Sequence, residues 1–166
     1  MTTAQINTIE AKASGVLENV FGNSIDVKLP ISLSNILDKY SLTLKTGTFE
    51  DKNVSGVFSR KDQEIYVAAD ESPNRKAFTV AHELGHYFLH EDKQTDVFLR
   101  EQILNITEES RETEKEANWF AAALLMPEKL IKKYYDLTKD IDILATIFGV
   151  SPTAVYFRLK NLGLAA

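Results

Sequence analysis

The most informative stretch of this sequence is residues 72–90, which read SPNRKAFTVAHELGHYFLH. Apolar residues recur through it at three- and four-residue steps, which is the period of an amphipathic helix. Ser72 followed by Pro73 is typical of a helix start, because a serine side chain caps free backbone amides and proline fits the first turn. All three histidines of the chain lie in this stretch four residues apart, so they share one face of the predicted helix.

His82, Glu83 and His86 form an HExxH sequence on this helix. Two histidine nitrogens one turn apart can meet one tetrahedral zinc, while the intervening glutamate reaches its open, water-bearing position. Zinc lowers the pKa of that water to about 7, and Glu83 can then carry its proton to a leaving amine. The spacing predicts metal-assisted hydrolysis, with His82 and His86 as ligands and Glu83 as general base. Hydrogen-bonded core histidines without a metal are the structural alternative.

His90 continues the row of histidines but lies at the predicted C-terminal end of the helix. An imidazole at that position can cap free carbonyls or pack behind a site. A single straight helix does not readily offer three ligands to a tetrahedral metal, so we expect the third ligand elsewhere. Because the chain has no cysteine and no further histidine, that ligand must be a carboxylate or a tyrosine.

A second strong helix, predicted from about Arg111 to Met126, is the best source of the third ligand. Its small residues allow close contact with the first helix, and Glu114 lies at the start of an apolar stripe along one face. Glu112 and Glu116 are rivals by proximity. A glutamate at a helix start also has the simpler role of a favourable interaction with the helix dipole, so spacing alone leaves the choice open.

The other elements follow from periodicity. In chain order, we expect helices over 3–20 and 32–40, a strand over 42–45, a hairpin of strands 54–58 and 64–68, a short helix around 98–103, and helices over 128–135, 141–148 and 153–162. An exposed hairpin edge beside a zinc site can hold an extended peptide, although an ordinary role in a small sheet is equally compatible with the sequence.

The last two predicted helices, separated by Gly149, resemble a helix-turn-helix. The second of them has only Arg158 and Lys160 as basic groups, and its other residues are better suited to packing. We therefore favour a structural helical pair or a partner surface, with DNA contact as the weaker alternative.

Composition and charge narrow the class of protein. With 166 residues, 44% of them hydrophobic, the chain suits one globular domain or a compact catalytic unit with a small helical appendage. Residues 91–116 hold nine acidic and four basic residues and carry the entire net charge of -5, so the chain has no overall attraction to nucleic acid. No long apolar run or signal-peptide pattern occurs, and we expect a cytoplasmic protein without a membrane span.

Two segments, FTVAHELGHYFLH at 78–90 and EKEANWFAAALLMP at 114–127, together resemble the ImmA/IrrE family of metallopeptidases. The resemblance covers roughly residues 56–128. It implies Zn²⁺ as the cofactor, His82, His86 and Glu114 as its ligands, and Glu83 as the catalytic base. Asn118, one turn after Glu114, either orients that carboxylate or serves hydrogen bonds between the helices.

The predicted elements together indicate a fold, and the resemblance implies an activity and a substrate. The expected fold is α+β: a minimal zincin-like domain over 1–136, with a small antiparallel sheet packed on the HExxH helix and a second Glu-bearing helix, and then a C-terminal helical segment over 137–166. The implied activity is a zinc-dependent endopeptidase that cleaves a helix-turn-helix transcriptional repressor and relieves repression of a mobile element, a prophage or a stress response. The alternatives are a non-catalytic partner of a repressor or toxin, and a DNA-binding regulator with a structural zinc site.

Overall fold

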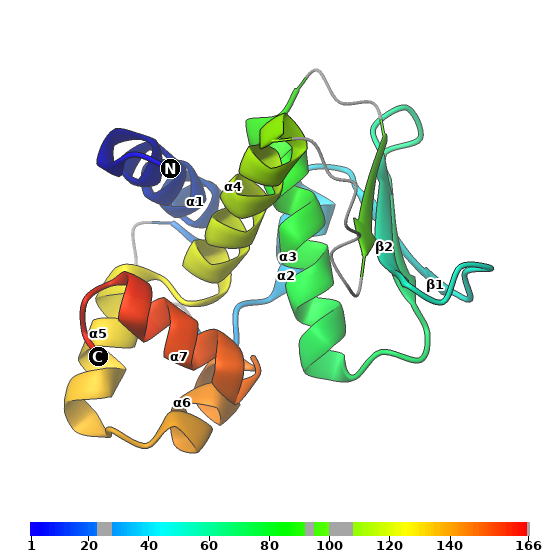
Figure 1. Cartoon of the computed structure of the whole chain (residues 1–166). Helices are drawn as coiled ribbons and strands as arrows, with labels where there is room; N and C mark the ends of the chain where they lie inside the picture. The colour runs from blue at the N-terminus through cyan, green and yellow to red at the C-terminus, as the bar shows by residue number, and fades with distance from the viewer. Residues whose placement is uncertain (23–27, 92–94, 100–107, 166) are drawn as a thin grey trace.

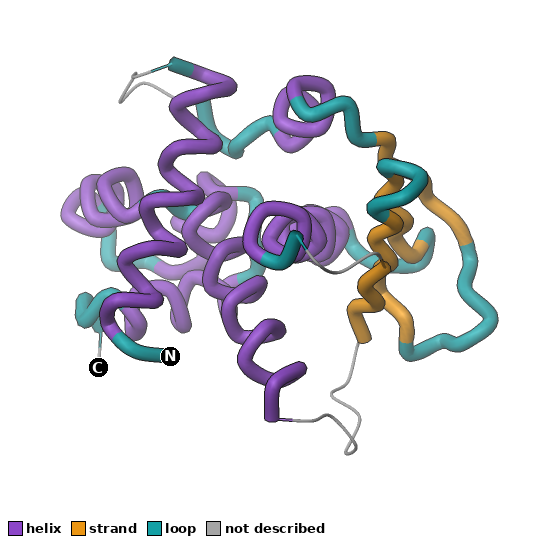
Figure 2. Tube along the Cα trace, turned by 90° about the horizontal axis from the view of Figure 1, so that it is seen from above, coloured by secondary structure: helices purple, strands orange, loops and turns teal. Residues whose placement is uncertain are grey.

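The computed structural model describes residues 1–22, 28–91, 95–99 and 108–165. A small sheet lies on one side of a central helix, and most of the other helices lie on its opposite side (Figures 1 and 2). The elements in chain order are α1 (Thr3–Phe21), α2 (Leu33–Lys39), β1 (Thr43–Gly47), β2 (Val54–Ser59), β3 (Glu64–Ala68), α3 (Pro73–Leu89), β4 (Thr95–Leu99), α4 (Glu108–Leu125), α5 (Glu128–Leu137), α6 (Ile141–Phe148) and α7 (Pro152–Asn161). The α+β class predicted from the sequence is confirmed.

The sheet has the strand order β1-β3-β2-β4 and contains the predicted hairpin as β2 and β3. It differs from the expected antiparallel sheet because β1 pairs with β3 in parallel, while β2 is antiparallel to both β3 and β4. Both hairpin strands are inner strands with partners on each side. Of the two roles that the sequence left open for the hairpin, an open edge for a peptide is excluded, and the outer strands are β1 and β4.

The predicted short helix around 98–103 is also wrong where it can be compared, because Phe98 lies in strand β4. Pairing with β2 satisfies backbone groups that β2 would otherwise leave open, and such long-range pairing leaves no trace in local periodicity. The other positions of that prediction, 100–103, lie outside the described residues.

Helix α3 begins as predicted and is fastened at its end by a residue of the hairpin turn. The Ser72 side chain accepts a hydrogen bond from the Arg75 amide, and Pro73 occupies the first turn. At the other end, the Arg60 guanidinium donates from Nη2 to three backbone carbonyls. These belong to His86, Tyr87 and His90, at 3.3, 3.0 and 3.2 Å. The hairpin turn thus supplies the C-terminal cap of α3, which links the sheet to the helix end.

Helices α3 and α4 pack closely because two small residues face each other. A Cβ atom added at Gly85 would lie 2.9 Å from the Ala117 Cα atom and 3.0 Å from its carbonyl oxygen, so a larger residue at position 85 would push the backbones apart. Both residues lie within the buried interior of the molecule. The contact brings the HExxH segment against α4, as the small residues of α4 predicted.

The helix pair α6 and α7 is joined at Gly149, whose φ of 65° places it in the left-handed region. Arg158 of α7 is 1% exposed and forms a bidentate ion pair with Glu10 of α1, at 2.5 and 3.0 Å. Its Nε also donates to the Met126 carbonyl. One of the two basic groups on which DNA contact by α7 depended is therefore buried in an ion pair, which weakens that interpretation. The division of the chain at 136/137 stays a prediction.

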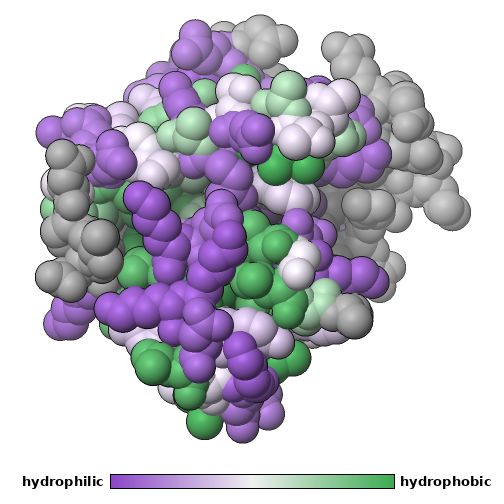
Figure 3. Space-filling model, turned by 90° about the vertical axis from the view of Figure 1, so that its left-hand side faces the viewer, coloured by the Kyte–Doolittle hydropathy of each residue, from purple (hydrophilic) through white to green (hydrophobic). Residues whose placement is uncertain are grey.

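The outer surface of the molecule combines hydrophilic and hydrophobic areas. On the face seen in Figure 3, hydrophilic residues run across the middle, with hydrophobic patches beside them. In the part of the chain that the structure describes, none of the helices combines the length and apolarity needed to cross a membrane.

Candidate metal centre

Three side chains from α3 and α4 converge on one point. The Nε2 atoms of His82 and His86 are 3.0 Å apart, and they lie 3.1 and 3.2 Å from the two carboxylate oxygens of Glu114. Both histidines are buried, while the Glu114 side chain is 20% exposed. The structure thus brings together the three residues expected to hold the metal, and among the described residues they form the cluster suited to one.

Asn118 fixes the ring of His82. Its Oδ1 lies 3.0 Å from Nδ1 of His82, and an amide oxygen only accepts, so we assign the ring proton of neutral His82 to Nδ1. The bare Nε2 then faces Glu114. Asn118 was expected either to orient Glu114 or to bond between the helices, and the contact it makes is an interhelical one to His82.

His90 and Glu116 form a second chain of contacts behind His86. Nδ1 of His86 lies 3.0 Å from Nδ1 of His90, and Nε2 of His90 lies 2.9 Å from Oε2 of Glu116. Since the carboxylate accepts from Nε2, the bare Nδ1 of His90 accepts the Nδ1 proton of His86. His90 therefore lies behind the cluster and does not join it, which agrees with the role expected from the sequence.

The two rival glutamates of α4 have other partners. Glu116 contacts His90, as just described. Glu112 pairs with Lys115 at 2.7 Å and with the terminal amine of Met1 at 3.5 Å. Of the three acidic candidates, Glu114 is the one whose carboxylate meets both histidines.

The charge states of the cluster suit metal binding. Burial lowers the pKa of His82 below its usual value near 6.5, so the ring is neutral at neutral pH. Burial alone would raise the pKa of Glu114, but its contacts with His82 and His86 outweigh that effect and hold the pKa well below its usual value near 4.5. A neutral His82 imidazole and an ionised Glu114 carboxylate are forms that bind a metal ion.

The donor set fits zinc. With Nδ1 of His82 next to Asn118 and Nδ1 of His86 next to His90, the two Nε2 atoms and the Glu114 carboxylate converge as a donor set that a cation can bridge. Zinc bonds of about 2.0–2.1 Å in a tetrahedron imply ligand atoms about 3.3 Å apart, close to the separations observed. Three nitrogen and oxygen ligands leave a fourth position open, as in catalytic zinc sites.

Glu83 lies on the side of α3 that faces the sheet. Its side chain is fully buried, and a Cβ added at Gly56 of β2 would lie 3.2 Å from Oε1 of Glu83 and 2.4 Å from the Thr79 side chain. The missing side chain at Gly56 therefore leaves the room that the Glu83 carboxylate occupies.

A family model described as the IrrE N-terminal-like domain, of the peptidase family M78, matches residues 38–160. The chain belongs to this family. The resemblance to ImmA/IrrE metallopeptidases expected from the two helix segments is confirmed, and the match extends beyond those segments into α7.

Two proteins are similar to part of this chain. The chain is 29% identical over 108 residues to "Uncharacterized immunity region protein 2" of Bacillus phage phi105, over 63% of this chain and 66% of that protein. It is 27% identical over 97 residues to the metallopeptidase ImmA of Bacillus subtilis (strain 168), over 57% of this chain and 54% of that protein. The chain thus spans about two thirds of the length of the phage protein and about half of the length of ImmA.

A solved structure shares the fold. A Mycobacterium tuberculosis transcriptional regulator superposes with a TM-score of 0.61 at 19% identity, over 95% of this chain and 47% of the regulator. The likeness covers nearly the whole of the present chain.

Three features of the site could not be predicted from the sequence. The contact between His90 and Glu116, the cap supplied by Arg60 and the space left by Gly56 all join residues far apart in the chain. The four-residue spacing of the histidines was the one local signal, and it placed His90 beside His86 without identifying a partner.

Proposed function

We propose that this chain is a zinc-dependent endopeptidase that cleaves a helix-turn-helix transcriptional repressor and so relieves repression. The observation that carries the chemistry is the convergence of His82, His86 and Glu114 at 3.0–3.2 Å, with Nδ1 of each histidine in contact with Asn118 or His90 instead. The substrate class rests on the family and on the name of one relative, an immunity region protein of a phage.

The residues have distinct roles in the proposed reaction. Zinc bound by His82, His86 and Glu114 would polarise a peptide carbonyl and lower the pKa of an attacking water to about 7. Asn118 and His90 hold the two rings so that Nε2 of each faces the metal position. Glu83 accepts a proton from the attacking water and donates it to the amide nitrogen of the leaving group, so the peptide bond breaks with one water consumed.

Replacement of Glu83 by Gln separates catalysis from binding. Glu83→Gln keeps the size of the side chain and removes the base, so zinc and repressor binding should persist while cleavage stops. The substrate to use is a small helix-turn-helix repressor encoded beside this gene, incubated with the zinc-loaded chain and followed by mass spectrometry of the fragments. Cleavage by the Gln variant would refute the role of Glu83, and stable binding without cleavage by the native chain would favour a non-catalytic partner.

A further inference from the structure

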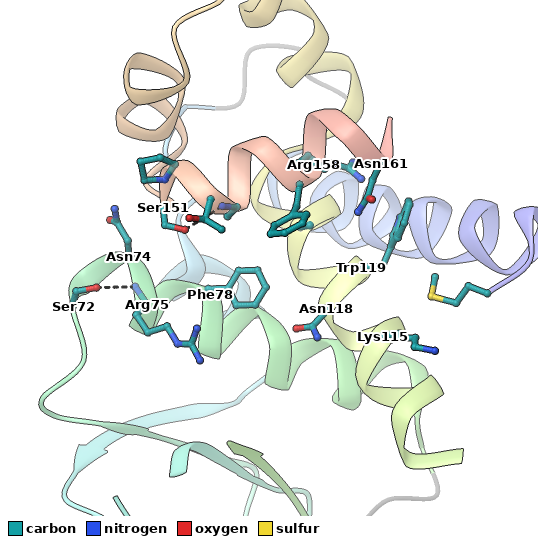
Figure 4. Close-up of a pocket in the computed structure, with 16 residues that line it drawn as sticks. Ser72, Asn74, Arg75, Phe78, Lys115, Asn118, Trp119, Ser151, Arg158 and Asn161 are labelled. Carbon is teal, nitrogen blue, oxygen red and sulfur yellow. Dashed lines mark hydrogen bonds between the residues drawn. The ribbon is translucent and has the colours of Figure 1, made fainter. Parts of the chain in front are cut away.

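A cavity of about 870 Å³ lies between α3, α4 and α7, within the range of roughly 300–1,000 Å³ usual for ligand sites (Figure 4). Its walls are largely apolar and include Phe78 of α3, Trp119 of α4 and Phe157 of α7. Phe157 is 54% exposed, which is unusual for a large apolar residue. Exposed aromatic rings around a hollow are typical of a binding surface.

The cavity adjoins the metal centre. Asn118 lines it and also contacts His82 of the cluster. Phe78 lies one helical turn before His82 on α3, and Asn118 lies one turn after Glu114 on α4. One turn is about 5.4 Å, which is less than two residues of extended chain, so a peptide with a side chain in the cavity would pass the metal centre within one or two residues.

The charged groups around the cavity are basic. Arg75, Lys115 and the buried Arg158 line it, and none of the described lining residues is acidic, although the whole chain has a net charge of -5. Each of these basic residues pairs with a glutamate, Lys115 with Glu112, Arg75 with Glu71 and Arg158 with Glu10, but none of these glutamates lines the cavity.

The starts of two helices add to this positive potential. Ser72 and Ser151, the N-caps of α3 and α7, both lie on the cavity wall. Helix N-termini carry partial positive charge. Together with the basic side chains, they favour an occupant with an apolar part and a carboxylate at its side.

We propose that this cavity is the specificity pocket of the peptidase and receives one large apolar side chain of the protein substrate, with an acidic residue next to it in the sequence. The inference rests on the proposed peptidase function. The apolar walls bind the side chain, and the basic edge at Arg75 and Lys115 attracts the neighbouring carboxylate. Recognition of this pair selects which bond lies at the metal centre.

Trp119 allows a direct test, because it is the only tryptophan of the chain and lines the cavity. Zinc-loaded Glu83→Gln protein is titrated with blocked hexapeptides of alanine that contain Phe-Glu or Glu-Phe at the centre, and Trp119 fluorescence is recorded. Matched peptides replace the Phe by Ala or the Glu by Lys. We expect at least about tenfold weaker binding for each matched peptide, as is usual for losing one buried apolar group or one charge contact.

Two variants and two controls locate the binding. Ala122→Phe places a large ring in the cavity, and Arg75→Glu reverses its edge charge, so both should weaken binding of the better peptide about tenfold or more while zinc content stays unchanged. Ala11→Phe and Lys52→Glu make the same changes at exposed positions away from the cavity and should bind like the parent protein. Equal binding of all peptides, or equal binding by Ala122→Phe and its control, would overturn the proposal.

The outcome is separable from that of the proposed function. Selective peptide binding without cleavage of any repressor by the native chain would retain the pocket and refute the peptidase activity. Cleavage of a repressor that is unaffected by Ala122→Phe would retain the activity and refute the pocket.

Discussion

His90 and Glu116 lie 2.9 Å apart, from Nε2 of the histidine to Oε2 of the glutamate, and so join the end of α3 to α4. His90 in turn contacts Nδ1 of His86. Contacts of this kind orient a ligand ring and raise its basicity. The third histidine of the row therefore supports, from behind, the His86 ring that we propose as a metal ligand.

Removing this support should weaken zinc binding. For His90→Ala and Glu116→Ala we expect an affinity about 10–100-fold lower, because the His86 ring loses its orientation. Competition with a chromophoric chelator measures the affinity. Glu112→Ala, on the same helix but paired with Lys115, is the control and should leave it unchanged. Equal loss in the control and the test variants would contradict the role of the pair.

Gly85 should be needed for the helix contact on which the metal centre depends. Gly85→Ala places a Cβ 2.9 Å from the Ala117 backbone, so α3 and α4 must separate, and we expect a loss of about 1–3 kcal/mol in the free energy of unfolding together with weaker zinc binding. Urea denaturation measures the first effect. Gly15→Ala in α1 meets no atom within 4 Å and should stabilise by about 0.5–1 kcal/mol. A stabilised Gly85→Ala protein would contradict the close packing.

Removing the Glu10 carboxylate should lower the free energy of unfolding, because its ion-pair partner Arg158 is buried. Glu10→Ala leaves the buried guanidinium of Arg158 without its carboxylate, for which we expect a cost of about 3–5 kcal/mol by urea denaturation. The double variant Glu10→Leu with Arg158→Met removes both charges and should recover much of that loss. Glu18→Ala, an exposed position on the same helix, should change stability little. A double variant no more stable than the single one would count against this explanation.

The metal-free protein should lose stability as the pH falls below about 6.5. Burial lowers the pKa of His82 in the folded state, so the unfolded chain binds the proton more readily. The stability due to neutral His82 is fully present above pH 6.5, and it falls by up to about 1.4 kcal/mol per pH unit until the folded pKa is reached. Urea denaturation at several pH values should show a shallower slope for His82→Gln. An unchanged slope in that variant would assign the pH dependence to other groups.

The sequence predicted well those features that depend on local periodicity and capping. Helix α3 begins at the predicted cap, the hairpin of β2 and β3 forms, and the HExxH spacing and Glu114 identified the residues that the structure brings together. These features depend on residues close in the chain, or on a family resemblance with two specific segments.

Long-range pairing explains what the sequence did not predict. Strand β4 forms because β2 offers it an edge. Strand β1 pairs with β3 in parallel because the chain reverses between β1 and β2 and again between β2 and β3, so β1 and β3 run in the same direction. Arg60 looked like ordinary turn material, yet it caps a helix whose end lies 26 to 30 residues away in the chain. Side chains that act across such distances carry no local signal.

The central claim is that His82, His86 and Glu114 hold one zinc ion, and the most direct measurement is the metal content of the reconstituted chain. After removal of metal, addition of zinc and extensive dialysis, elemental analysis should give one zinc per chain with nitrogen and oxygen ligands by X-ray absorption. The Glu114→Ala variant should retain far less, and Glu112→Ala as much as the native chain. A native chain without bound zinc, or full zinc content in Glu114→Ala, would contradict the claim.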